Sequence, residues 1–221
     1  MIQAAIFDVD GTLLDSLSMW EKIDQQYLSS LGCQASEEIS RQLFTYSLEE
    51  GARFIKETFH LSKSVETIVA ELVALANDYY LHDVPVKKGV KKVLNTFYQQ
   101  GLPMAICTSN HKDVIDQVLK AHQMERYFRY VTTVDEVGQG KESPQIYLTA
   151  CDHLQATPSH TLVFEDALHA IETLSKTDFI TVGCYDDYSR KDQPEIKQLS
   201  TYYVHEIDEI LPCLETGAVV D

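Results

Sequence analysis

The chain reads Asp8-Val9-Asp10-Gly11-Thr12-Leu13-Leu14-Asp15-Ser16 directly after a short apolar stretch, residues 4–7, that predicts a buried strand. The carboxylates of Asp8 and Asp10, together with backbone carbonyls, would surround one small volume at the end of that strand. Oxygen ligands of this kind suit Mg²⁺. They also offer one carboxylate as a nucleophile and a second as a proton donor. The alternative is an ordinary acidic turn, since Asp-Gly is a common turn pair.

A second polar stretch follows another predicted strand. Residues 103–107 are apolar and lead into Thr108, Ser109 and Asn110, after which we expect a helix over residues 111–120. Hydroxyl and amide groups beside the free N–H groups of a helix start form a site for an anion. The alternative is a plain helix N-cap, which Ser and Asn also favour.

A lysine lies in a later loop, in the sequence Gly140-Lys141-Glu142-Ser143-Pro144. Ser143 as N-cap and Pro144 at the first helical position predict that a helix starts directly after this loop. We therefore expect Lys141 to be a mobile loop cation that can meet a phosphate group and neutralise crowded carboxylates.

Two further acids end a predicted strand. Residues 162–164 are apolar and are followed by Glu165 and Asp166. Acids at strand ends are often helix caps, so this signal is modest when it is taken alone.

In this order, the four stretches resemble the four motifs of the haloacid-dehalogenase-like hydrolase superfamily, and within it the subgroup of β-phosphoglucomutase and small sugar-phosphate phosphatases. The resemblance covers essentially the whole chain. It implies a Mg²⁺-dependent phosphatase that hydrolyses a small phosphate monoester, a sugar phosphate or similar metabolite, through an aspartyl-phosphate. The implied roles are nucleophile for Asp8 and acid and base for Asp10. Asp8, the Asp10 carbonyl and Asp166 would bind Mg²⁺, with Glu165 nearby as a further ligand or as a hydrogen-bond acceptor beside them. Thr108, Ser109, Asn110 and the catalytic Lys141 would contact the phosphoryl group.

Strands and helices alternate after residue 84. We expect strands over 104–107, 130–134, 162–164, 179–182 and 202–204, with helices that include 87–100 and a short terminal one near 207–211. This alternation indicates an α/β fold, a Rossmann-like parallel sheet core flanked by helices on both faces. Ligands of such sheets bind outside the carboxyl ends of the strands, which places Asp8, Asp10, Thr108 and Asp166 in one site.

Residues 16–83 break the alternation, because helices alone are expected there, over 17–31, 36–44, 48–59 and 64–80. The resemblance identifies this insert as an all-helical cap domain, with residues 1–15 and 84–221 forming the catalytic core. The two connections, at residues 15–16 and 83–85, would act as hinges. Closure of the cap would exclude water and assemble the site.

The cap departs from the phosphomutase pattern of this subgroup. Phosphomutases of this type carry a His where the chain has Trp20, and Ser-Arg-Glu-Asp where it reads Ser47-Leu48-Glu49-Glu50. An Arg for a second phosphate is missing there, so a phosphatase is favoured over the alternative, a β-phosphoglucomutase-like phosphomutase. Trp20 is expected to bind the non-phosphate part of the substrate beside Met19, although packing between cap and core would also explain both residues.

Two departures follow the fourth motif. The family often has Ser directly after it and Gly three residues further on, where this chain has Ala167 and Ala170. The missing hydroxyl at Ala167 would remove a hydrogen bond near the metal. Ala170 favours the helix, since Ala is the better helix former.

Composition limits the partners. Asp and Glu number 34 against 18 Lys and Arg, a formal net charge of −16. Such a field repels nucleic acid and anionic membrane surfaces, so we expect neither as a partner. Five scattered cysteines indicate reduced thiols, and the first strand begins almost at Met1; both favour a cytoplasmic protein. Nothing in the pattern demands a partner chain, and we expect a monomer or weak homodimer.

Two other functions remain open. A dehalogenase of the superfamily would keep Asp8 but would need neither an acid at position 10 nor Mg²⁺, so Asp10 disfavours it. A catalytically silent binding module on the same fold is possible in principle. The complete set of acids and lysine disfavours that reading.

Overall fold

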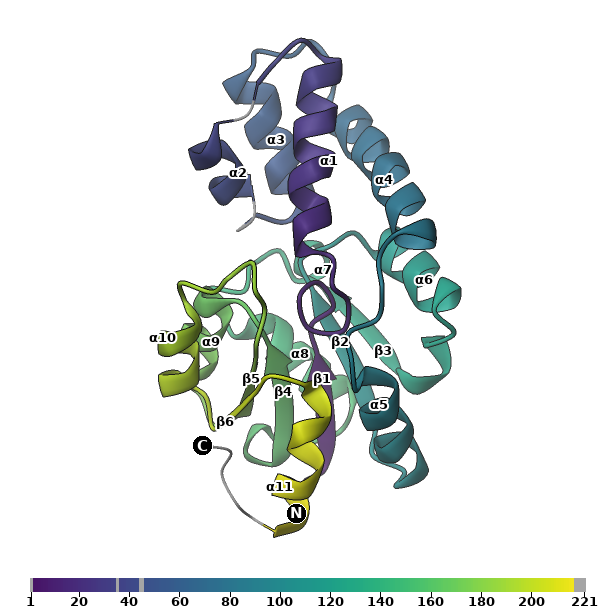
Figure 1. The fold of residues 1–221 in the computed structure, drawn as a ribbon, viewed down its shortest axis with the longest axis vertical. Coiled ribbons are helices and arrows are strands. Elements are labelled where there is room, and N and C mark those ends of the chain that lie inside the picture. The colour runs from purple at the N-terminus through teal and green to yellow at the C-terminus, as the bar shows by residue number, and fades with distance from the viewer. Residues whose placement is uncertain (1, 35, 44–45, 217–221) are drawn as a thin grey trace.

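The structure, a computed structural model, describes residues 2–34, 36–43 and 46–216, and its centre is a parallel sheet (Figure 1). Six strands lie in the order β3-β2-β1-β4-β5-β6, and every neighbouring pair is parallel. The predicted α/β fold is therefore confirmed. The strands are β1 (Ala4–Phe7), β2 (Met104–Thr108), β3 (Tyr130–Thr133), β4 (Thr161–Glu165), β5 (Ile180–Cys184) and β6 (Tyr202–Val204).

Helices cover both faces of this sheet. Alternate residues of β1 point to opposite faces: Ala5 and Phe7 join one hydrophobic cluster with α5, α6 and α11, whereas Ala4 and Ile6 join another with α8. Burial on both faces explains why the strands are apolar runs without polar alternation. These helices are α5 (Val90–Gln99), α6 (Lys112–Ala121), α7 (Val134–Val137), α8 (Gln145–His153), α9 (Leu168–Leu174), α10 (Gln193–Leu199) and α11 (Ile210–Thr216), with 3₁₀ turns η1 (Glu125–Tyr127), η2 (Pro158–His160) and η3 (Ile207–Glu209).

Four more helices lie together beyond the carboxyl ends of the strands (Figure 1). We call them the cap helices: α1 (Leu17–Ser30), α2 (Glu37–Leu43), α3 (Leu48–Thr58) and α4 (Val65–His82). Within the group α4 packs against α1 and α3, and it also packs against α6 of the sheet layer. None of the helices in the described ranges is long and apolar enough to cross a membrane.

The two links between the cap helices and the sheet run side by side. The Asp15 N–H donates to the Pro85 carbonyl (3.1 Å), and the Lys87 N–H donates to the Leu13 carbonyl (2.9 Å). Leu14 and Val86 form an antiparallel bridge between these two hydrogen bonds. The chain thus leaves the sheet layer and returns to it through one short two-stranded ladder.

Element boundaries differ from the predictions by a few residues, with physical reasons. The helix expected from residue 87 starts at Val90, because Gly89 has a left-handed backbone conformation (φ 82°). Val134 does not continue β3: the Thr133 hydroxyl accepts the Glu136 N–H (3.2 Å) and starts α7 instead. Pro144 precedes α8 rather than opening it, while Ser143 accepts the N–H of the first helical residue, Gln145 (3.3 Å).

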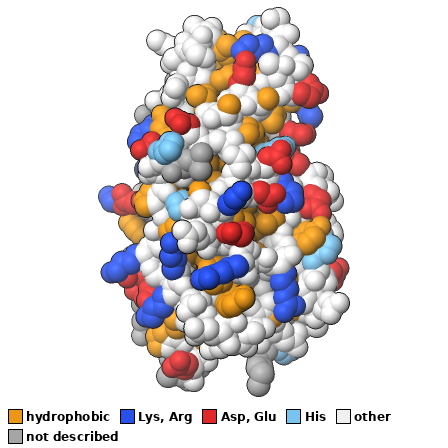
Figure 2. All heavy atoms as spheres, turned by 90° about the vertical axis from the view of Figure 1, so that its right-hand side faces the viewer, with side chains coloured by type: hydrophobic (Ala, Val, Ile, Leu, Met, Phe, Trp, Pro, Cys, Tyr) orange, Lys and Arg blue, Asp and Glu red, His pale blue; other side chains and the backbone are white. Residues whose placement is uncertain are grey.

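Charged side chains are mixed on the face that carries α4 and α6 (Figure 2). Lys and Arg are most numerous over the sheet half of this face, with Asp and Glu among them. Hydrophobic side chains show in patches between them. This face therefore carries charges of both signs, although the sequence as a whole has an excess of acidic residues.

A stack of two phenylalanines lies directly beneath the strand ends. Phe7 and Phe164 are paired across β1 and β4, fully buried, and their ring centroids are 4.4 Å apart. The next residue on each strand is an acid, Asp8 and Glu165 respectively. The packing of this stack therefore fixes the positions of the two carboxylates relative to each other at the carboxyl ends of β1 and β4.

We expect Phe164→Ala to lower the free energy of unfolding by about 3–5 kcal/mol, because it leaves a cavity under the strand ends. Urea denaturation measures this change. Tyr98→Ala is the matched control, since that ring is 53% exposed and its loss should cost about 1 kcal/mol or less. Equal losses in the two variants would contradict the structural role of the stack.

Candidate active site

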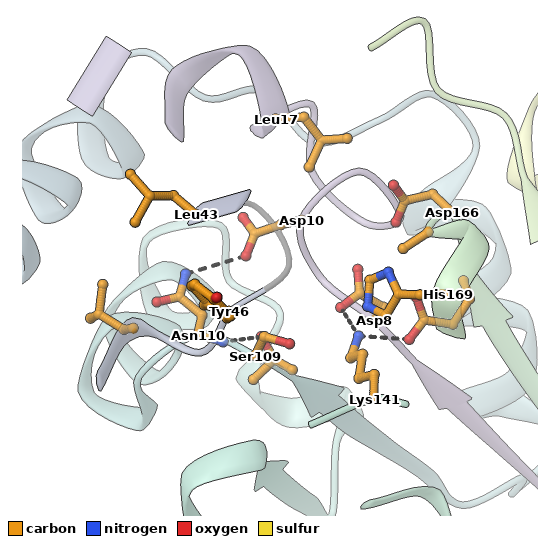
Figure 3. A pocket seen from close by; sticks show the side chains of 14 residues that line it. Asp8, Asp10, Leu17, Leu43, Tyr46, Ser109, Asn110, Lys141, Asp166 and His169 are labelled. Atoms are coloured by element: carbon orange, nitrogen blue, oxygen red, sulfur yellow. Dashed lines mark hydrogen bonds and ion pairs between the residues drawn. The ribbon is translucent and has the colours of Figure 1, made fainter. Parts of the chain in front are cut away.

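A cavity of about 120 Å³ opens at the carboxyl ends of β1, β2 and β4, below the cap helices (Figure 3). The chain runs outward from β1 in one direction to β2 and β3, and on the other side of β1 lies β4. Such a switch in strand order is the usual ligand position in an open parallel sheet. The cavity is lined by Asp8, Asp10, Leu17, Leu43, Tyr46, Leu48, Thr108, Ser109, Asn110, Lys141, Glu165, Asp166, Ala167 and His169.

Three buried carboxylates meet at its floor. Asp8 follows β1, Glu165 ends β4 and Asp166 follows it; the three residues are 5%, 0% and 2% exposed. One carboxylate oxygen from each lies within 4.8 Å of the others. The structure therefore brings together three of the residues that the sequence predicted as one site.

A single ammonium group joins two of these acids. The Lys141 Nζ lies 2.6 Å from the Asp8 Oδ1 and 2.6 Å from the Glu165 Oε1. Lys141 lies in the loop before α8 and neutralises crowded carboxylates, as predicted. The expected mobility is wrong, because the residue is only 5% exposed and is held by two carboxylates. The Tyr147 hydroxyl also donates to the Glu165 Oε1 (2.7 Å).

Burial and crowding determine the charges of these groups. Burial, together with the neighbouring Glu165 and Asp10, raises the pKa of Asp8 to about 7, although Lys141 opposes the rise. Burial and the neighbouring Asp8 likewise raise the pKa of Asp166 well above its usual range. Burial alone would lower the pKa of Lys141, but Asp8 and Glu165 outweigh it and raise that pKa. The lysine therefore stays charged, while the acids are short of positive charge.

The acidic cluster fits a Mg²⁺ ion. Oxygen is the ligand atom that Mg²⁺ prefers, and the cluster offers oxygen atoms of three carboxylates. The Glu165 Oε2 is buried and has no hydrogen-bond partner, which is costly unless a cation or water meets it. One lysine cannot balance three buried carboxylates, so a divalent cation would supply the missing charge.

The loop that contains Gly11 and Thr12 packs closely against Asp166. Gly11 adopts a positive φ of 90°, and a side chain there would place its Cβ 2.4 Å from the Asp166 Oδ2. The Thr12 hydroxyl donates to the Asp166 Oδ1 (3.1 Å), and the Lys87 Nζ donates to the Gly11 carbonyl (2.6 Å). Sequence reasoning missed both Thr12 and Lys87, because neither differs in pattern from an ordinary turn or helix-start residue.

Asp10 lies apart from the acidic cluster, on the side of the cap helices (Figure 3). Its carboxylate accepts hydrogen bonds from the Ser16 hydroxyl (2.5 Å), the Asn110 amide (3.2 Å) and the Tyr80 hydroxyl. The two aspartates of the first motif thus have different surroundings. Asp8 faces an ammonium group and two acids, whereas Asp10 faces three neutral donors.

The loop after β2 is ordered by its own side chains. The Thr108 hydroxyl accepts the Asn110 N–H (3.0 Å), and the Asn110 Oδ1 accepts the His111 N–H (2.8 Å). Thr108 and Ser109 line the cavity as predicted. Asn110 lines it too, but its amide group donates to Asp10 and Tyr80, so here it contacts a proposed catalytic acid.

The upper wall is apolar and was not predicted. Leu17, Leu43, Tyr46 and Leu48 come from the cap helices and the segment between α2 and α3. Their sequence pattern is that of apolar residues on the buried face of an ordinary helix, so it did not indicate that they line a cavity. The Trp20 side chain, predicted to bind substrate, lies outside the described part of the structure. Its neighbour Met19 is buried in the hydrophobic core.

His169 is a further lining residue that sequence reasoning missed. It lies in the first turn of α9, three residues after Asp166, and that spacing was the available signal. Burial, with the nearby Lys141 positive charge, lowers the pKa of His169, against the opposing effect of Glu165. The imidazole is therefore predominantly neutral near pH 7 and can donate or accept a hydrogen bond.

Comparisons with known proteins agree with this geometry. The family model described as haloacid dehalogenase-like hydrolase matches residues 5–183. A phosphorylated carbohydrates phosphatase of Thermotoga maritima is 25% identical over 77% of this chain and 79% of the relative. Validoxylamine A 7'-phosphate phosphatase of Streptomyces hygroscopicus subsp. limoneus is 27% identical over 83% of this chain and 85% of the relative.

Solved structures share the fold. CbbY from Rhodobacter sphaeroides, in complex with phosphate, superimposes with a TM-score of 0.83 at 20% identity, covering 95% of this chain and 96% of that one. A β-phosphoglucomutase from Clostridium difficile gives a TM-score of 0.77 at 18% identity, covering 95% and 93%.

We expect Mg²⁺ to bind about tenfold more weakly at pH 6 than at pH 8, because below a pKa of about 7 the metal must displace a proton from Asp8. Raising the pH removes this competition at Asp8 and also at Asp166, whose pKa is raised too, so affinity rises with pH. Isothermal titration calorimetry at the two pH values measures the change. Asp15→Asn, which removes an exposed carboxylate of the same loop, should leave the dependence intact. A pH-independent affinity would contradict the role of Asp8.

Proposed function

The chain belongs to the haloacid dehalogenase-like hydrolase family and is a phosphoric monoester hydrolase, and we propose that it cleaves a small sugar-phosphate-type ester through a phosphorylated Asp8. The observation that carries the proposal is the division of roles between two carboxylates beside one cavity. Asp8 lies against a buried ammonium at 2.6 Å, and Asp10 lies among neutral donors. Two carboxylates in unlike surroundings are the usual arrangement for a nucleophile and an acid.

In the proposed reaction an Asp8 oxygen attacks phosphorus and the bond to the leaving oxygen breaks. Asp10 protonates that oxygen as it leaves, and later takes a proton from the water that hydrolyses the aspartyl-phosphate. Lys141 holds one Asp8 oxygen and faces the negative charge of the transferring group. Thr108 and Ser109 offer hydroxyl groups to the phosphoryl oxygens from the opposite wall.

Asp8, Glu165 and Asp166 would hold Mg²⁺, with the Asp10 carbonyl as a further ligand. When bound, the ion neutralises charge on the phosphoryl oxygens and favours the ionised form of Asp8. The protein residues position the nucleophile and the acid. Phosphoryl transfer depends mostly on such positioning and on cations that face the dispersed charge.

The cavity suits a compact substrate with one phosphate. Its volume of about 120 Å³ is below the range of about 300–1,000 Å³ that is usual for small-molecule sites. Among the lining side chains that the structure describes, Lys141 is the only lysine or arginine, so no second phosphate would be matched there. The apolar wall of Leu17, Leu43, Leu48 and Tyr46 would contact the carbon skeleton. We therefore favour a monophosphate ester over a bisphosphate.

We further propose that residues 16–83 act as a cap that moves relative to a core of residues 1–15 and 84–221. The two links that join the cap helices to the sheet layer lie side by side, which is the geometry of a hinge. Opening would admit a substrate larger than the cavity. Closing would return the apolar wall to the floor and exclude water.

We expect Asp8→Asn to abolish Mg²⁺-dependent phosphate release from p-nitrophenyl phosphate and from a panel of sugar phosphates, because the amide does not attack phosphorus. Loss by a factor of at least about 10⁴ is expected for removal of a nucleophile. Steady-state phosphate release with and without Mg²⁺ measures this, and Asp15→Asn is the matched control. Activity of Asp8→Asn at the wild-type level would refute the mechanism.

A further inference from the structure

Resting on the proposed function, we propose that Tyr80 is a positioning residue for the reaction. It holds the Asp10 carboxylate where that group protonates the leaving oxygen. Tyr80 lies near the end of α4, a cap helix, so the cap contributes directly to the geometry of the acid. The residue is 1% exposed and lies 70 positions from Asp10 in sequence.

Two hydroxyl groups and one amide group donate hydrogen bonds to the Asp10 carboxylate. Its Oδ1 accepts from the Tyr80 and Ser16 hydroxyls, and its Oδ2 accepts from the Asn110 Nδ2 (3.2 Å). The same Asn110 amide donates to the Tyr80 oxygen (3.0 Å), which thus accepts one hydrogen bond and donates another. All three donors bind the carboxylate, and Asn110 and Tyr80 are also hydrogen-bonded to each other.

The donors come from three separate parts of the chain. Ser16 directly precedes α1, Tyr80 lies three residues before the second link begins at Asp83, and Asn110 follows β2. Asp10 is therefore tied to both ends of the cap helices and to the loop after β2. A movement of the cap that displaced Tyr80 or Ser16 would alter the orientation of Asp10.

The Ser16 hydroxyl binds Asp10 and does not stabilise the start of α1. It occupies the N-cap position of α1, where a serine hydroxyl ordinarily accepts a backbone N–H of the first turn. No such cap bond is present at Ser16, and the hydroxyl donates to Asp10 at 2.5 Å instead. The N-cap serines of α3 and α4, Ser47 and Ser64, do make the ordinary bond.

Tyr80 is also placed where the cap meets the sheet layer. Its helix packs against α6, which begins two residues after Asn110. The phenol ring packs in the hydrophobic core, and its oxygen is the polar end that reaches Asp10. Packing fixes the ring, so the hydroxyl reaches the carboxylate from a rigid position.

The test compares two aryl esters of similar size. Phenyl phosphate has a poor leaving group that needs a proton, whereas p-nitrophenyl phosphate has a good one that does not. A correctly held acid accelerates departure of the leaving group from the first ester only. The later hydrolysis of the aspartyl-phosphate is common to both esters, so the comparison uses kcat/KM, which reports the steps up to that departure. We expect Tyr80→Phe to lower kcat/KM for phenyl phosphate by about tenfold to a hundredfold, with less than about a threefold change for p-nitrophenyl phosphate.

Tyr79→Phe is the matched control, since it removes the same atom one position earlier on α4. The Tyr79 hydroxyl donates to the Gln26 Oε1 (3.1 Å), and Gln26 is not among the residues that line the cavity, so removal of this hydroxyl should change neither rate. Ser16→Ala removes another donor to Asp10 and should reproduce the selective loss. Thermal melting of each variant shows whether it is folded.

A loss of kcat/KM that is equal for the two esters in both Tyr80→Phe and Ser16→Ala, or no loss at all, would overturn the positioning role while leaving the phosphatase intact. Wild-type protein that hydrolyses neither ester with Mg²⁺ would instead refute the proposed function, and the positioning role with it. The two failures are therefore distinguishable in one set of assays.

Discussion

Three buried carboxylates share one buried ammonium at the floor of the cavity, and this imbalance of charge governs the site. Lys141 reaches Asp8 and Glu165, and the remaining Glu165 oxygen has no partner among the described residues. Isolated charges at such depth are strongly disfavoured, which is why the pKa values of Asp8 and Asp166 rise. The same shortage of positive charge would favour a divalent cation at the floor of the cavity.

The sheet makes this crowding possible. Strands β1 and β4 are neighbours in register, so Asp8 and Glu165 emerge side by side above the stacked Phe7 and Phe164. An apolar layer beneath the acids keeps water away from their lower side. Stability and reactivity are thus linked through the same two strands, since loosening the stack would also let the carboxylates move apart.

Much of this could be predicted from the sequence, because local patterns carry the information. Apolar runs that end in Asp8, Thr108 and Glu165 identified the strands and their functional ends, and parallel pairing brought those ends together. The burial of Lys141 could not be predicted. A loop lysine has the same local pattern whether it is solvated or buried, and only the fold places two carboxylates 2.6 Å from it.

Contacts between distant segments were also missed. Tyr80 has the spacing of an apolar helix face, so its pattern indicates core packing, and its hydroxyl contact with Asp10 depends on how α4 meets α6. Ser16 has the pattern of a helix cap, and its departure from that role is visible only in three dimensions. His169 and the apolar wall were missed for the same reason, since their shared feature is a cavity and not a motif.

The short ladder formed by residues 13–15 and 85–87 has a consequence for how such enzymes diversify. The chain departs from the sheet layer and re-enters it at hydrogen-bonded neighbours, so the inserted segment closes on itself like a loop with fixed ends. Segments joined at adjacent points tolerate replacement and changes in length. The insert can therefore be exchanged or remodelled while the carboxylates and the lysine at the floor of the cavity stay in place.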